Sequence, residues 1–221
     1  MDPQQRTVLE LSRDLLEPLA GERDIGVFVG AGNHAYSEAI SAHLGEPLHP
    51  NAMAGNLLNM IAARVAHHYD LQGPALAVDT ACSSGLVALH LAAQSLATGE
   101  CRYAIAGGVH LNLTPAQHQL FDNAGALSPT GQCRPFHPDA DGMVPGEGTV
   151  LFLLQPADAA RAEGRAPIGI LRASAINNDG TSLGVMAPNP AGQEAVIRRA
   201  LRQAEVEPTE VCYVEAHGTG T

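Results

Sequence analysis

Cys82 stands where a reactive thiol is expected. It follows a short apolar run and a turn of small residues, and an amphipathic segment begins directly after it. The unpaired N–H groups and the positive dipole end of a helix start favour thiolate over thiol, and the same N–H groups can bind the oxyanion of an acyl intermediate. The sequence therefore predicts a nucleophile whose own backbone N–H is an oxyanion donor. A buried structural cysteine is the alternative.

The segment after Cys82 has the spacing of a helix. Four apolar residues recur at intervals of three and four positions, namely Leu86, Leu89, Ala93 and Leu96. Gly99 follows, and glycine is a common stop signal just past a helix. We therefore predict a helix that begins after Cys82 and ends at Gly99.

A second candidate for chemistry lies near the other end of the sequence. Residues 211–215 form a strand-like run, and His217 follows in a loop of glycine and threonine that extends to Thr221. This placement sets His217 apart from the other histidines of the chain.

The elements that must position these residues alternate along the sequence. Apolar, β-rich runs predict strands at residues 25–29, 74–79, 103–109, 149–154, 168–175 and 211–215. Helical segments lie between them; one has its N-cap at Asn189 and its first residue at Pro190. Strands that alternate with helices imply an α/β fold with a largely parallel, buried sheet. The irregular stretch 112–148 is too long for a simple connector, and such loops usually carry function.

Composition narrows the class of protein. The 221 residues are 45% hydrophobic and include 23 glycines, enough for one compact α/β core of closely approaching elements. A net charge of -11 with only 12 basic residues argues against a nucleic-acid partner. We see no apolar stretch of membrane-spanning length and no export signal, so the expectation is a cytoplasmic protein without a membrane partner. The four cysteines lack zinc-site spacing, which predicts neither a disulfide nor a structural metal.

A glycine pattern raises a different class. Residues 30–35 fit G-x-G-x-x-A after a strand, the turn that binds dinucleotides in NAD-dependent oxidoreductases. The confirming feature is an acidic residue roughly twenty positions further on, and residues 48–52 supply none. Glycines after buried strands also serve packing, which is the interpretation we favour.

Two further groups could be sites. His67 and His68 are adjacent, but neighbouring helix residues point about 100° apart and cannot easily share one metal ion. Asp139, Asp141 and Glu147 could form a carboxylate pair for acid–base chemistry.

The two catalytic candidates together resemble one family, the ketosynthases of polyketide and fatty-acid synthases. Its active cysteine lies in D-T-A-C-S-S and its first catalytic histidine in E-A-H-G-T-G-T, and residues 79–84 and 215–221 match both letter for letter. Further blocks resemble the family's linking motifs in the same order, at residues 125–129, 133–136, 140–142, 146–148 and 187–189. Residues 140–148 and 176–180 look closer to the polyketide side. The resemblance is therefore to a β-ketoacyl synthase domain of a modular type I polyketide synthase.

The resemblance implies a mechanism. Cys82 accepts an acyl chain from the phosphopantetheine arm of an acyl carrier protein, and a malonyl-type extender then loses CO2 and attacks that thioester. His217 is one of the two histidines that stabilise the extender's enolate, and the second histidine and a lysine lie beyond the H-G-T-G-T motif. No cofactor is bound, because the substrates ride on phosphopantetheine. A discrete fatty-acid ketosynthase and a non-elongating, acyl-carrying ketosynthase remain as alternatives.

The resemblance also assigns binding residues. Thr219 and Thr221 hydrogen-bond the pantetheine amides. Met143 stands where many members have an aromatic residue and lines the acyl pocket, while Met186 replaces a threonine that usually contacts pantetheine. The family gives Asp141 and Glu147 a structural role, in which they hold the loop through backbone hydrogen bonds.

The fold that the resemblance implies is the thiolase fold, five α-β-α-β-α layers built from two related halves. Residues 1–160 correspond to the N-terminal half without its first strand, and residues 161–221 to the beginning of the C-terminal half. We therefore expect an internal fragment that is inactive in condensation on its own. The parent is expected to form a homodimer through the strand at residues 74–79.

Overall fold

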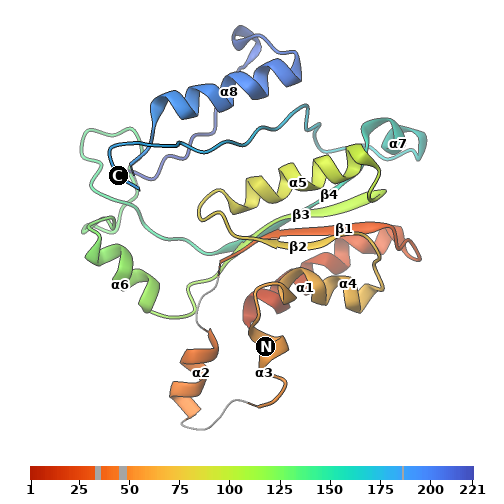
Figure 1. Ribbon diagram of the computed structural model, residues 1–221, viewed down its shortest axis with the longest axis horizontal. Helices are drawn as coiled ribbons and strands as arrows, with labels where there is room; N and C mark the ends of the chain where they lie inside the picture. Colours follow the sequence, from red (N-terminus) through yellow and green to blue (C-terminus); the bar gives the residue numbers. More distant parts are fainter. Residues whose placement is uncertain (33–35, 45–48, 186) are drawn as a thin grey trace. The chain divides into compact units, whose positions relative to one another are not determined.

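The computed structural model describes residues 1–32, 36–44, 49–185 and 187–221 (Figure 1). The chain forms two compact units. The first contains residues 1–156 together with 217–221, and the second contains residues 157–216.

The first unit is built on a four-stranded sheet with the strand order β2-β1-β3-β4. The strands are β1 (Ile25–Gly30), β2 (Ala75–Val78), β3 (Tyr103–His110) and β4 (Gly148–Leu154), each within a residue or two of the predicted bounds. All six residues of β1 are buried, because this strand is covered on both faces and paired on both edges. Continuous apolar composition is typical of such a strand.

The prediction of a largely parallel sheet is confirmed, with one antiparallel strand among the described ones. β1 pairs parallel with β2 and β3, whereas β4 runs antiparallel to β3. The Asn112 backbone N–H donates to Glu147 Oε1 at 2.6 Å, so the loop between β3 and β4 returns to the point where β3 ends. β4 therefore starts where β3 ends, which forces the antiparallel direction.

Helices cover both faces of the sheet in the first unit. α1 (Pro3–Leu16) and α4 (Met60–Tyr69) lie on one face, and α5 (Ser84–Thr98) lies on the other, as Figure 1 shows. Val8, Ile61 and Val65 join the core of the first face, while Ala88 and Ala92 pack on Phe28 in the core of the second. The other helices among the described residues of this unit are α2 (Tyr36–Leu44), α3 (Ala52–Asn56), α6 (Ala116–Asn123) and a short 3-10 helix (Glu17–Leu19).

α5 forms over the predicted range, and Leu89 and Leu96 of the predicted apolar stripe are partly buried against the core, although other positions of the helix are buried more deeply. It ends at Gly99, which adopts the left-handed conformation with φ 75°. Leu86 is 74% exposed, and the buried positions include Ala88, Ala92 and Ser95. Small side chains face the sheet because the helix lies close to it.

The second unit contains α7 (Ala157–Ala162), α8 (Pro190–Ala204) and a 3-10 helix (Pro208–Glu210). The predicted start of α8 is confirmed, since Asn189 Oδ1 accepts the Ala191 N–H at 3.1 Å. The strands predicted at residues 168–175 and 211–215 are wrong. Their apolar side chains are exposed, for example Ile168 at 96%, and neither run belongs to a strand of the described sheet. Apolar composition favours a strand, but a strand forms only where a neighbouring chain accepts its hydrogen bonds.

Candidate active site

Cys82 lies exposed in a tight turn between β2 and α5. Ala81, directly before it, has φ 53°, in the left-handed region that residues other than glycine rarely adopt. Asp79 Oδ1 accepts the Ala81 N–H at 3.0 Å, and Ser84 Oγ donates to the Ala81 carbonyl at 2.6 Å. Backbone strain of this kind persists where the surroundings fix it, and it clusters at functional sites.

The helix start beside Cys82 is not capped by its N-cap side chain. Ser83 Oγ donates to the Thr80 carbonyl at 2.9 Å instead of accepting an N–H group of α5. The first N–H groups of a helix have no acceptor within the helix itself. Two of the N–H groups beside the thiol are bonded within the turn, since Ser83 N–H donates to the Thr80 carbonyl at 3.4 Å and Ser84 N–H to the Ala81 carbonyl at 3.1 Å. The role of the Cys82 N–H as an oxyanion donor stays a prediction.

Glycines bring α5 close enough to the sheet to fix this turn. A Cβ at Gly30 would lie 2.4 Å from the Ser84 backbone carbon, and one at Gly108 would lie 3.4 Å from Gly85 Cα. Gly30 therefore serves helix–sheet packing, in line with the interpretation favoured over a dinucleotide-binding turn. Positions 33–35 of that pattern lie outside the described residues.

His217 is exposed at the start of a loop held against the loop at residues 126–143, within the same unit. The Gly142 N–H donates to the Gly220 carbonyl at 3.0 Å, and Cys133 Sγ lies 3.3 Å from the Thr219 carbonyl oxygen. The hydroxyls of Thr219 and Thr221 are hydrogen-bonded to each other at 2.8 Å.

Asp141 holds the loop at residues 126–143 in a way that differs from the expected backbone bonds. Its carboxylate accepts from Ser128 Oγ at 2.6 Å and from Thr130 Oγ1 at 3.0 Å, and Arg134 Nη2 lies 3.7 Å away. The bonds are made by side-chain hydroxyls because the carboxylate faces the Ser-Pro-Thr turn. The Ser128 bond, with smaller contributions from Thr130 and Arg134, lowers the pKa of Asp141 despite opposing desolvation. Glu147 does bond a backbone N–H, that of Asn112.

The predicted binding residues fall into separate places. Met143 is half-buried beside Gly142, and its backbone bonds Ala126 and Ser128, so it lies next to the loop that carries Thr219. Met186 lies outside the described residues. The hydrogen bonds of the described residues join neither Cys82 nor its turn to His217.

Two features of the site could not be foreseen from the sequence. The first is the set of contacts made by Cys133 and Arg134, which the sequence marks only as part of a family motif. The polar residues near Asp141 are the one sequence signal for a hydrogen-bond network there. The left-handed Ala81 gives no signal in the sequence, because alanine has no preference for that conformation.

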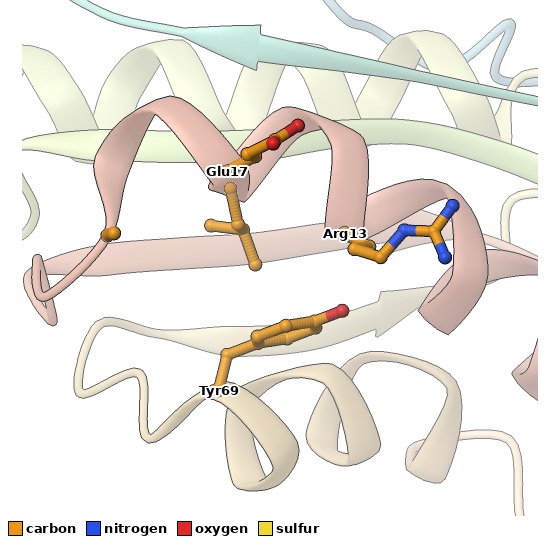
Figure 2. Close-up of a pocket in the computed structure, with 5 residues that line it drawn as sticks. Arg13, Glu17 and Tyr69 are labelled. Carbon is orange, nitrogen blue, oxygen red and sulfur yellow. The ribbon is translucent and has the colours of Figure 1, made fainter.

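A separate pocket of about 380 Å³ opens between α1 and α4, lined by Arg13, Leu16, Glu17, Ala20 and Tyr69. Figure 2 shows Tyr69 rising from α4 toward the side that carries Arg13 and Glu17. None of the predicted site residues lines this pocket. Within the described ranges no cluster of three or more His, Cys, Asp or Glu residues could hold a metal ion. Among those same residues, no helix has the length and apolar character needed to cross a bilayer.

The chain matches two described families. Residues 1–160 match "Beta-ketoacyl synthase, N-terminal domain", and residues 168–221 match "Beta-ketoacyl synthase, C-terminal domain". Among curated relatives, it is 49% identical to a phenolphthiocerol/phthiocerol polyketide synthase of Mycobacterium tuberculosis, over 100% of this chain and 12% of that protein. It is 45% identical to erythronolide synthase EryA3 of Saccharopolyspora erythraea, over 100% of this chain and 7% of that protein.

Solved structures agree with the sequence relatives. The ketosynthase from module 6 of the bacillaene synthase of Bacillus subtilis 168 superimposes with a TM-score of 0.91 at 36% identity, over 100% of this chain and 39% of that one. The oxazolomycin ketosynthase domain OzmH KS7 of Streptomyces albus JA3453 gives 0.90 at 37% identity, with the same coverage. The predicted α/β thiolase fold is confirmed, and this chain spans about two fifths of the solved domains. The chain belongs to the β-ketoacyl synthase family.

Proposed function

We propose that this chain is part of a ketosynthase that extends polyketide chains, with Cys82 as its nucleophile. The observation that carries the proposal is the exposed Cys82 on a strained turn at the start of α5. The relatives above are polyketide synthases, which does not favour a discrete fatty-acid ketosynthase.

The first step is acyl transfer. The Cys82 thiolate attacks the carbonyl carbon of an acyl-pantetheine thioester, a new C–S bond forms, and the pantetheine thiolate leaves and takes up a proton. The negative charge on the tetrahedral oxygen is stabilised by the Cys82 N–H next to the helix start.

The second step is decarboxylative condensation. The bond between the free carboxylate and the α-carbon of a malonyl-type extender breaks, CO2 leaves, and the electron pair remains as an enolate. His217, with a second histidine, stabilises the enolate oxygen. The enolate carbon then attacks the Cys82 thioester, a C–C bond forms, and the Cys82 thiolate leaves.

The loop at residues 217–221 also guides the substrate arm. Thr219 and Thr221 bind the pantetheine amides, which is supported by their paired hydroxyls beside Gly220. Met143 lines the acyl pocket, and a flexible thioether there suits longer or branched chains.

The partners follow from the chemistry and from the sheet. The acyl donor and the extender arrive on an acyl carrier protein. β2 is an edge strand whose Leu76 is 45% exposed, so a second copy can extend the sheet across a two-fold axis to form a homodimer.

The proposal is tested in the full-length protein that carries this chain, supplied with acyl- and malonyl-loaded carrier protein. Cys82→Ala should abolish acylation, measured by peptide mass. His217→Ala should keep acylation but lose condensation by orders of magnitude, because removing one member of a cooperating catalytic set costs that much. Acylation without condensation in the wild type would identify a non-elongating carrier instead.

The 221 residues alone are proposed not to condense. Large apolar side chains are exposed, among them Leu183 at 103% and Val185 at 106%, and such surfaces promote association. A β-ketoacyl product from the isolated chain would contradict this part of the proposal.

A further inference from the structure

The loop that carries His217 is held by its backbone carbonyls. Consecutive carbonyl oxygens of Gly218, Thr219 and Gly220 face the loop at residues 126–143. The Cys133 thiol lies 3.3 Å from the Thr219 oxygen and 3.9 Å from that of Gly218, and the Gly142 N–H donates to the Gly220 oxygen. A thiol is a weak donor, and a carbonyl oxygen is its natural acceptor.

The two loops approach each other closely at two glycines. A Cβ at Gly220 would lie 3.0 Å from the Gly142 carbonyl oxygen, 3.1 Å from the Arg134 nitrogen and 3.5 Å from Cys133 Sγ. Gly142 itself has φ 145°, and a Cβ there would lie 2.4 Å from the Leu127 carbonyl carbon. The thiol therefore meets the carbonyls in a contact set by backbone packing.

The loop that supplies the thiol is braced in turn. Asp141 accepts from the hydroxyls of Ser128 and Thr130, and Arg134 Nη2 donates to Thr130 Oγ1 at 2.7 Å. Cys133 lies between these residues in the sequence, so its position is fixed on both sides.

We propose that Cys133 is a positioning residue for the proposed condensation: its thiol donates to the Thr219 carbonyl and thereby orients His217 and the two threonine hydroxyls. This inference rests on the proposed function of that loop. Cys133 forms no covalent intermediate and takes no part in acyl transfer, which occurs at Cys82.

The test compares Cys133→Val and Cys133→Ala, which remove the donor, with Cys133→Ser, which keeps one. Cys212→Val is the matched control, since Cys212 is also an exposed free cysteine. In the full-length protein, the first two should lower the kcat of condensation on the order of tenfold to a hundredfold, as small misplacements of catalytic groups do. Acylation of Cys82 should stay within about twofold of wild type, Cys133→Ser should recover most of the rate, and Cys212→Val should leave it unchanged.

A second measurement does not depend on activity. Amide hydrogen exchange of the peptide that covers residues 215–221 should accelerate in Cys133→Val and Cys133→Ala and return toward wild type in Cys133→Ser. If exchange is the same in all four proteins, the inference fails even where activity changes. Wild-type protein that neither acylates nor condenses would overturn the proposed function. The exchange data would still show whether the Cys133 thiol holds the loop at residues 217–221 in place.

Acyl groups found on Cys133 by peptide mass would also overturn the inference, because the thiol would then be a second acceptor. A condensation rate in Cys133→Ser no better than in Cys133→Val would likewise contradict it, since the donor would not be what matters.

Discussion

Single residues set the chemistry of this chain, and Cys82 differs from the other cysteines in what surrounds it. Cys101 is 3% exposed and lies 3.4 Å from Ser95 Oγ, and the Cys133 thiol faces carbonyl oxygens. Cys82 is exposed beside the positive end of α5. The thiol is therefore open to electrophiles, on a strained turn of the kind that clusters at functional sites.

We therefore predict that Cys82 is the most nucleophilic thiol of the folded full-length protein. Limiting iodoacetamide followed by peptide mapping should label Cys82 first. Cys212, exposed but away from any helix start, is the internal control. Earlier labelling of Cys101, Cys133 or Cys212 would remove Cys82 from its assigned role.

A second prediction at this scale concerns pH. The pKa of Asp141 is lowered, first by the Ser128 hydrogen bond, so its ionised form is favoured in the folded loop. The resulting stabilisation is fully present above the ordinary carboxyl pKa of about 4 and disappears as pH falls through the lowered folded pKa. Protection of residues 126–143 from hydrogen exchange should fall over that range in wild type. Asp141→Asn should flatten the dependence, whereas Asp139→Asn should not.

Elements decide where those residues lie, and the glycines between α5 and the sheet are the clearest case. Gly30→Ala should destabilise the protein by about 1–3 kcal/mol, since the added methyl collides with backbone atoms that cannot move aside. Gly146→Ala is the control, because a Cβ there meets nothing within 4 Å. The measurement is denaturant unfolding of the full-length protein; equal stabilities for the two variants would contradict the packing role of Gly30.

Many of the helices and strands could be predicted from the sequence, and the two wrong strand predictions have a physical cause. The predictions of β1 to β4 from apolar composition are correct because these runs find pairing partners within the first unit. The start of α8 could be predicted because Asn189 and Pro190 are local signals. The runs at 168–175 and 211–215 have the same composition but form no strand in the part of the chain that the structure describes. Local composition records a tendency, whereas pairing depends on residues far away in the sequence. The bracing of Cys133 and Asp141 is non-local in the same way.

At the scale of the whole molecule, the free edge of β2 is the feature with the largest consequence. We predict that the full-length protein sediments as a dimer at micromolar concentration. Leu76→Lys should shift it toward monomer, because a charge on an edge strand opposes pairing. Leu11→Lys, on the partly exposed side of α1, should leave the dimer intact. A wild-type monomer would refute the prediction.

The hydrogen bond between Asn112 and Glu147 bears on which segments of this fold can be exchanged. Since it ties the two ends of residues 111–147 together where β3 ends and β4 begins, we expect that the stretch between them can be exchanged without disturbing the strands. Loop length itself carries only a small entropic cost. A transplanted stretch must nevertheless arrive with its own version of residues 217–221, because the two segments fit together backbone to backbone. Chimeras that swap one without the other should fold yet misplace the histidine.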